Sequence, residues 1–479
     1  MTAADRRAGG LIGLTGGTIT GSWASGAVAG GDYVGGLAGM NYNGSIAHSE
    51  ATGNVTGINQ VGGLAGNSTG SVTDSNASGK VIGTFEVGGL IGSVGASVNR
   101  SYATGDVEAL DENAYKVGGL IGGSSASVEN SYATGSVTAN GDRIGGLIGD
   151  QYMRKVANSY ALGHVTGKNF VGGLIGFGDT FPLEHSFASG TVEGNHNVGG
   201  LVGYLMGSAA LTNNIATGQV TGVEYVGGLV GQDSDNGNAQ ISSYMNQMAF
   251  GDVSGVSRVG GLAGSCACFI EQSYAEGDVT GTSGSQVGGL AGSMPTGKVK
   301  NSYAKGKART VNTDEVGGLV GYVRNSVETS YATGDVIADG ALYGGLAGSI
   351  AYPENLINSY YSGNASDGNN LGKKLTEQQL KQIGQLQGFG FVNSASMENP
   401  WLIVPGETTP FPRNGHAAQP AIQLNGPVAS SVNVGDQLQL SGQVALGSVT
   451  QAVYEDSRVK PLYVFYNLVD QNGQTLETK

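Results

Sequence analysis

The sequence predicts an all-β fold, a parallel β-solenoid (β-helix) of about 13 coils that we expect to be right-handed. Glycine provides 87 of the 479 residues, about 18% against a usual ~7%. The tripeptide Gly-Gly-Leu occurs thirteen times between Leu11 and Leu346, at spacings of 26 to 33 residues. Between these copies, β-branched residues and glycines form short runs separated by turn dipeptides, which favours strands over helices.

A second block recurs with the same period, as in Asn130-Ser-Tyr-Ala-Thr-Gly-Ser-Val137. Two fixed blocks in each period define one structural unit. Each unit is long enough for two or three short strands, and stacked units rise ~4.8 Å per coil. Thirteen coils therefore predict a rod about 60 Å long.

The copies of the second block indicate which side chains face inward, because alternate residues of a strand face opposite ways. The alanine hardly varies, whereas the position before it holds Trp23, Glu50 or Asn76. A position that accepts glutamate and asparagine faces solvent. We therefore expect the serine, alanine, glycine and valine of Ser-Tyr-Ala-Thr-Gly-x-Val to face a narrow interior.

The first block, as in Val171-Gly-Gly-Leu-Ile-Gly176, breaks strict alternation. Its valine and leucine have opposite parity, so a regular strand cannot bury both. A bulge at the Gly-Gly pair would bury both, with glycine adopting the positive φ that a bulge needs.

Together the two blocks resemble the GLUG repeat of large bacterial surface proteins, and the resemblance covers residues 9 to 361. Such repeats occur in adhesin-like proteins and in immunoglobulin A proteases. Those proteases carry a His-Glu-x-x-His zinc motif, and no histidine of this chain is followed by glutamate. The resemblance therefore implies display or attachment rather than catalysis.

The chain divides into three parts: repeats over residues 1–361, a C-terminal cap over 362–418, and an incomplete immunoglobulin-like β module over 419–479. In the cap, residues 375–384 predict a helix with a Thr376–Gln379 capping box and an apolar face of Leu380 and Ile383. We expect this helix, with the aromatic residues Phe389, Phe391 and Trp401 behind it, to cover the last coil.

The last part has alternating patterns at residues 421–424, 437–440 and 462–466, followed by an Asn472-Gly473 hairpin turn. These strands are too few for a full sandwich, so we expect a module cut at Lys479. The first residues lack the apolar core of a secretion signal, and we interpret the N-terminus as a cut through a larger protein.

The formal net charge of −14 disfavours nucleic-acid binding, because an acidic surface repels phosphates. No apolar run approaches the ~18 residues of a membrane helix, so we expect no membrane insertion in this segment. The sequence also predicts no cofactor. Cys266 and Cys268 are expected to be buried or idle thiols, since a pair two residues apart would be strained.

The strongest binding candidate is a row of aromatic residues at the outward position before the alanine. If exposed, such a stripe could stack on sugar rings or anchor a protein; alternatively, it is a ladder that only stabilises the rod. Its predicted members are Trp23, Tyr102, Tyr132, Tyr160, Phe187, Tyr244, Tyr274, Tyr303, Tyr331 and Tyr360.

Other candidate sites are weaker. Asp233 and Asp235 lie at alternate positions, as in a calcium loop, but the pattern lacks further ligands, which favours a polar turn. His164, His185 and His196 differ in register, so we expect them in different parts of the cross-section. The sequence predicts no catalytic residue.

These observations predict a non-catalytic, extracellular adhesion or display segment of a larger bacterial protein, secreted or attached to the cell surface. Its partner would be a glycan or a protein on a host or neighbouring cell. Three alternatives stay open: a carbohydrate-active β-helix enzyme (lyase or hydrolase), a passive stalk of a surface protease, and, remotely, an ice-binding rod. The enzyme is disfavoured because the acids at one outward position, such as Asp106 and Asp335, form no paired groove.

Overall fold

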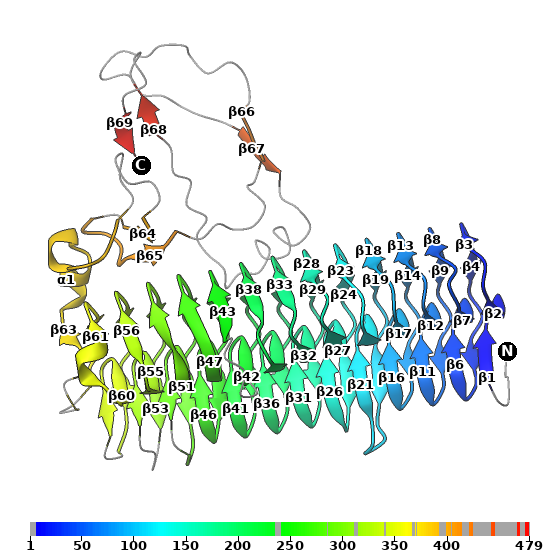
Figure 1. Ribbon diagram of the computed structural model, residues 1–479, viewed down its shortest axis with the longest axis horizontal. Coiled ribbons are helices and arrows are strands. Elements are labelled where there is room, and N and C mark those ends of the chain that lie inside the picture. Colours follow the sequence, from blue (N-terminus) through cyan, green and yellow to red (C-terminus); the bar gives the residue numbers. More distant parts are fainter. Residues whose placement is uncertain are drawn as a thin grey trace.

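The computed structural model describes residues 6–413, apart from 235–240, 285, 311–314, 340–341, 366–368, 370, 392–398 and 404. Beyond residue 413 it describes four strands, namely β66 (Ala421–Leu424), β67 (Gly442–Ala445), β68 (Asn467–Val469) and β69 (Thr475–Thr478). Residues 6–361 form a parallel β-solenoid of 13 coils, as the sequence predicts (Figure 1).

Ten of the 13 coils contain five short strands and three contain four, more than the predicted two or three. The second coil is representative and consists of β6 (Asp32–Gly35), β7 (Ala38–Asn41), β8 (Ile46–Ala47), β9 (Glu50–Ala51) and β10 (Val55–Thr56). The additional strands arise because corners interrupt the chain after two to five residues, except in β47 (Ala263–Glu271) and β51 (Ala291–Lys300), which run on through one corner.

Equivalent strands of successive coils pair in parallel and form four long sheets (Figure 1). We call the 13-stranded sheet from β1 (Arg6–Gly9) to β59 (Tyr343–Gly344) sheet 1. Sheet 2 holds 24 strands, two from most coils, including β7 and β8. Sheet 3 has 14 strands, from β4 (Trp23–Ala24) to β63 (Lys373–Lys374), and sheet 4 has 12, from β5 (Val28–Ala29) to β58 (Val336–Ile337).

The interior of each coil has two separate apolar lobes. The valines of sheets 1 and 4, such as Val34 and Val55, form one cluster. The leucine after Gly-Gly packs in the other with the inward residues of sheets 2 and 3, such as Leu37 and Ala51. The valine and the leucine of the first block are therefore both buried, but in different lobes.

A narrow waist separates the two lobes, and the second glycine of Gly-Gly lies in it. A Cβ added at Gly36 would lie 2.1 Å from the carbonyl oxygen of Gly63 and 2.9 Å from the Cβ of Ala51. The same approach recurs in later coils, for example between Gly146 and Ala161. The waist therefore requires both the glycine and the nearly constant alanine of sheet 3.

The predicted bulge at Gly-Gly is wrong in position. No glycine of these pairs has a positive φ among the described residues. The left-handed residue instead lies two positions before the first glycine, for example Tyr33 with φ 55° and Gln60 with φ 51°. Gly-Gly is required by close packing, whereas the left-handed residue before it turns the chain toward the waist.

A second left-handed residue lies at the corner between sheets 2 and 3, just before the block serine, for example Asn130 with φ 52°. Asparagine tolerates this conformation well, which explains the Asn-Ser pair of the repeat. The serine side chain faces inward, as predicted. Ser131 Oγ donates to the carbonyl of Glu129 (2.8 Å) and accepts the N–H of Ser101 in the previous coil (3.2 Å).

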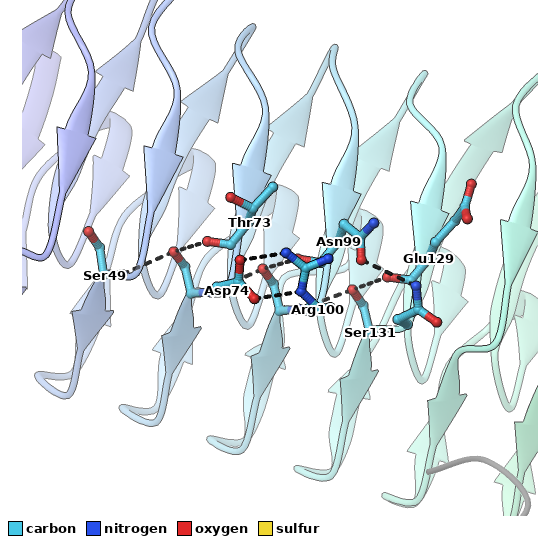
Figure 2. Close-up of polar contacts among 10 residues, drawn as sticks. Ser49, Thr73, Asp74, Asn99, Arg100, Glu129 and Ser131 are labelled. Atoms are coloured by element: carbon cyan, nitrogen blue, oxygen red, sulfur yellow. Dashed lines mark hydrogen bonds and ion pairs between the residues drawn. The ribbon is translucent and has the colours of Figure 1, made fainter. Parts of the chain in front are cut away.

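This pattern forms a ladder of serine hydroxyls along the rod, flanked by paired surface side chains such as Asp74 and Arg100 (Figure 2). The Arg100 guanidinium donates two hydrogen bonds of 2.7 Å to Asp74 and lowers the pKa of that carboxyl. The ladder satisfies backbone groups that the corner removes from regular pairing. Its serines are Ser49, Ser75, Ser101, Ser131, Ser159, Ser186, Ser273, Ser302, Ser330 and Ser359.

The C-terminal cap begins where β63 adds a last strand to sheet 3. Helix α1 (Glu377–Leu380) follows, with the predicted Thr376–Gln379 capping box, and a 3-10 turn, η2 (Ile383–Gln385), comes next. The helix is shorter than predicted. Leu380 is buried, but Ile383 is 46% exposed, so the predicted apolar face is wrong at Ile383.

The predicted aromatic residues of the cap cover the side of the rod as well as its end. Phe389, Phe391 and Trp401 pack in one cluster on the outer face of sheet 3 over the last coils. Strands β64 (Trp401–Leu402) and β65 (Phe411–Pro412) form an antiparallel pair there. At the end of sheet 1, the Asn369 N–H donates to the carbonyl of Tyr343 (2.9 Å), which closes part of the exposed edge.

In the C-terminal part, β66 coincides with the predicted strand at 421–424 and pairs antiparallel with β67. Strands β68 and β69 also pair antiparallel. The predicted Asn472-Gly473 turn and the predicted strands at 437–440 and 462–466 lie outside the described residues.

Candidate binding surfaces

The predicted aromatic row lies on the outer face of sheet 3, but it is not the continuous exposed stripe that the sequence suggested. Only Trp23 is fully exposed, at 73%. Four tyrosines are partly exposed: Tyr102, Tyr132, Tyr160 and Tyr274. The other four members of the row are buried, with at most 2% exposed: Phe187, Tyr303, Tyr331 and Tyr360.

Tyr244 does not belong to this row. It pairs in register with Leu211 and Ile270 of sheet 2 and is fully buried in the interior. Met248 occupies the row in this coil, between Ile215 and Tyr274. The prediction failed because this coil is five residues longer than the one before it. The extra residues lie between Ser234 and Ser243, ahead of most of β43 (Ser242–Met245), and obscure the register of the sequence.

The cap explains why three tyrosines of the row are buried. Tyr331 packs against Trp401 with ring centroids 5.9 Å apart, and its hydroxyl donates to the carbonyl of Pro410. Tyr360 packs against Phe389 at 5.8 Å. Tyr303 joins the same apolar cluster, and its hydroxyl donates to Glu276 (2.8 Å). These residues anchor the cap to the rod.

Tyr102, Tyr132 and Tyr160 form a regular stack on three successive coils. Neighbouring ring centroids are 4.8 Å apart, with interplanar angles of 1° and 2°. Each inner ring face is covered by the next ring, so the stack presents ring edges and hydroxyls outward. Burial raises the pKa of the Tyr132 hydroxyl, so this hydroxyl stays protonated, and able to donate a hydrogen bond, to a higher pH than in a free tyrosine.

The recurring aspartates that were considered for a carbohydrate-active enzyme have a structural role. Their side chains accept backbone hydrogen bonds at the corners between sheets 3 and 4. Asp106 Oδ1 accepts the N–H of Ser136 in the next coil (2.9 Å). Asp252 and Asp278 accept the equivalent N–H one coil further on, each at 2.8 Å. Asp335 does the same with Asn364 (2.8 Å). These carboxylates recur because they cap a corner.

Of the two calcium candidates, Asp233 is described, and it does not lie in the polar surface turn that the sequence favoured. Asp233 is buried, and its Oδ2 accepts the hydroxyl of Tyr244 (2.7 Å). Asp235 lies outside the described residues. Asp233 neighbours Cys266 and Cys268, whose sulfur atoms lie within 4.8 Å of its carboxylate. Contrary to the expectation of free thiols, a disulfide joins the two cysteines, so their sulfurs are not thiolate ligands.

The structure reveals a groove on sheet 1 that the sequence reasoning missed. In the first five coils, the side chains of the first two residues of the sheet 1 strand stand in two columns along the rod. In the first column, Arg6, Asp32, Asn59, Phe85 and Tyr115 are in register. The second column holds the left-handed residues Tyr33, Gln60, Glu86 and Lys116. Together they line a groove of about 360 Å³ over the first five coils.

The groove was missed because both columns vary between copies, and variable positions were interpreted only as solvent-facing. The left-handed residue places two consecutive side chains on the same outer face, which strict alternation does not predict. The available signal was the residue directly before Val-Gly-Gly, which is tyrosine, glutamine, glutamate or lysine in the second to fifth coils.

The fold and these surfaces define a rod-shaped repeat protein, a parallel β-solenoid with side-chain ladders on its outer faces. The GLUG motif matches four stretches of it, residues 30–56, 57–82, 113–138 and 314–337, and each spans about one coil. The chain is a GLUG-repeat protein. No curated protein and no solved structure matches it. The described residues contain no helix long and apolar enough to span a bilayer.

Proposed function

We propose that this chain is a non-catalytic adhesion or display segment of a secreted or cell-surface bacterial protein. It binds a glycan or a protein of a host or neighbouring cell through an outward face. The observation that carries this proposal is the stack of Tyr102, Tyr132 and Tyr160, which places three partly exposed tyrosines on one rigid face.

The geometry of the stack favours contacts at the ring edges. A tyrosine edge offers apolar surface together with a hydroxyl that both donates and accepts hydrogen bonds. Because register with the neighbouring coils fixes the rings, a partner binds them at little cost in side-chain entropy. Thr104 and Thr134 follow the same strands and add hydroxyls beside the rings.

Two triple variants separate adhesion from simple stabilisation of the rod. The first replaces Tyr102, Tyr132 and Tyr160 by serine and removes both rings and hydroxyls. The second replaces them by phenylalanine, which keeps the stack and removes only the hydroxyls. Binding of the intact chain and both variants is measured on an array of glycans and extracellular matrix proteins, with folding checked by circular dichroism.

We expect the intact chain to have at least one ligand on the array that the folded serine variant no longer binds and that the phenylalanine variant binds more weakly. If the serine variant keeps every ligand of the intact chain, adhesion belongs to another face. An intact, folded chain that binds nothing on the array would favour the passive stalk, which holds another domain away from the cell. The carbohydrate-active enzyme is disfavoured because the recurring acids cap backbone corners.

A further inference from the structure

We propose that the groove on sheet 1 of the first five coils is a binding site for a neutral oligosaccharide. This site lies on a different sheet from the tyrosine stack, so it goes beyond the proposed function and is tested independently of it.

The size and rigidity of the groove suit a short carbohydrate chain. Its volume of about 360 Å³ lies within the ~300–1,000 Å³ typical of small-molecule sites. Its walls stand on strands that pair in parallel with both neighbours, except the edge strand β1, so the backbone beneath the side chains is fixed. The groove runs along the rod and is open to solvent, which admits a chain of linked units.

The lining combines aromatic rings with planar polar groups. Tyr33 and Phe85 supply rings, and Phe85 is 37% exposed, whereas the Tyr115 ring is partly covered by the Arg143 guanidinium, 4.9 Å from its centroid. Aromatic rings pack against the C–H faces of sugars, and planar amides and carboxylates bond sugar hydroxyls. This pairing of apolar surface with a few fixed polar groups is what a selective site requires.

Hydrogen bonds between coils hold the polar groups in place. Asn59 Nδ2 donates to Asp32 Oδ1 (2.6 Å), and Gln60 Nε2 donates to Glu86 Oε2 (2.7 Å). Each amide has a second N–H, and each carboxylate has further lone pairs. Groups ordered before binding lose little entropy when they bond a ligand.

The charge of the groove favours a neutral ligand over an anionic one. Arg6 pairs with Asp32 (3.4 Å) and Lys116 with Glu86 (3.4 Å), so two cations balance two carboxylates within the lining. Lys116 also lies 3.5 Å from Asp150. No net positive charge remains to attract a sulfate, phosphate or uronate, and the whole chain is acidic.

A third column of side chains closes the groove toward the sixth coil. It comes from the third residue of each first strand in sheet 2, and in the fourth and fifth coils it contains the small residues Ser93 and Gly123. In the next two coils the same column holds Asp150 and Phe177. There the Arg143 guanidinium pairs with Asp150 and lies 3.9 Å from the Phe177 ring, which fills the space.

This column provides a blocking variant that the scaffold already accepts. Ser93→Phe places a phenylalanine at the position that Phe177 occupies three coils later, so it should fill the groove without unfolding the coil. Ser293→Phe makes the same change at the same register position of a distant coil, beside Tyr322, and serves as the control. Because Ser293 is buried, circular dichroism must first show that this variant is folded. Phe85→Ala removes the exposed ring while leaving the groove open.

The probes are immobilised chitohexaose, mannohexaose and laminarihexaose as neutral chains, heparin hexasaccharide and polygalacturonate as anionic chains, and a random hexapeptide library. We expect the intact chain to bind at least one neutral chain, with affinity lowered about tenfold or more in Ser93→Phe and Phe85→Ala. Ser293→Phe and the triple tyrosine variants should bind as the intact chain does.

Three results would overturn the proposal. The first is that no neutral chain binds the folded protein at millimolar concentration. The second is that only anionic chains or peptides bind. The third is that Ser293→Phe loses affinity as much as Ser93→Phe, which would place the site elsewhere. If binding of neutral chains is lost only in the triple tyrosine variants and not in Ser93→Phe or Phe85→Ala, the tyrosine stack is the binding site and the groove is rejected.

Discussion

At the residue scale, the cross-section of each coil depends on two positions where a larger side chain does not fit. The second glycine of Gly-Gly and the alanine of sheet 3 meet at the waist, where any larger side chain would collide with backbone. Two left-handed residues then turn the chain in each coil, and the block serine satisfies the backbone at one of these corners. The repeated residues are therefore those that close packing, the corners and the backbone hydrogen bonds of the coil require.

We predict that Gly146→Ala destabilises the rod by about 1–3 kcal/mol, the usual cost of overpacking. The new Cβ would lie 2.1 Å from the carbonyl oxygen of Gly173 and 3.0 Å from the Ala161 Cβ. Chemical denaturation followed by circular dichroism measures the free energy of unfolding. Gly95→Ala is the control, since its nearest neighbour would be 3.7 Å away. Equal stability of the two variants would contradict the waist.

We predict that Ser131→Ala lowers the free energy of unfolding by about 1–3 kcal/mol, because it leaves buried groups without a partner. The variant loses the bond to the Glu129 carbonyl and the acceptor of the Ser101 N–H. Faster hydrogen exchange at the Ser101 amide would report the second loss directly. Thr138→Ala, at an exposed position of the same coil, should change neither quantity.

At the element scale, the cap and the row of tyrosines form one unit. The outward tyrosines of sheet 3 are partly exposed in the fourth to sixth coils and buried under the cap in the last coils. The same position of the repeat therefore faces solvent in one part of the rod and holds the cap in another. Tyr331 and Tyr360 hydrogen-bond to backbone carbonyls of the cap and pack against its aromatic residues.

We predict that the cap detaches at alkaline pH. Burial raises the pKa of Tyr303 and Tyr331, so a state with the cap released ionises first. The stability of the docked cap is therefore unchanged below the ordinary tyrosine pKa of about 10 and falls as the pH rises above it.

Trp401 reports this transition, because it is buried beside Tyr331 and the chain has only one other tryptophan, Trp23. In a Trp23→Phe variant, we expect a red shift of Trp401 emission above pH ~10. Replacing Tyr303 and Tyr331 by phenylalanine should suppress the shift. If emission is insensitive to pH in both proteins, ionisation does not control docking of the cap.

At the scale of the whole molecule, the rod is quasi-one-dimensional. Each coil contacts mainly its neighbours, and four sheets run along the length of the rod (Figure 1). Stability in such a protein is a sum over coils and their interfaces, so a defect in one coil spreads only over nearby coils.

We therefore predict that Leu174→Asp unfolds the central coils and leaves the first coils folded. Leu174 is fully buried, and an unpaired buried charge costs several kcal/mol. Hydrogen exchange read by mass spectrometry should show lost protection around residues 147–201 and retained protection around residues 30–82. Leu162→Asp, at a side chain 37% exposed on the same rod, should have little effect. Global unfolding by Leu174→Asp would contradict the one-dimensional description.

The sequence by itself determined the repeat, the parallel β-solenoid, the inward serine and alanine, and the capping box at Thr376. These features depend on local periodicity and on copies that can be compared within one chain. Only the tertiary structure decided that Gly-Gly forms a waist, that the cap buries Tyr331, that Tyr244 lies in the interior, and that Phe85 and Glu86 line a groove. Such features depend on which coil or cap a residue meets across space, and no local pattern encodes that contact.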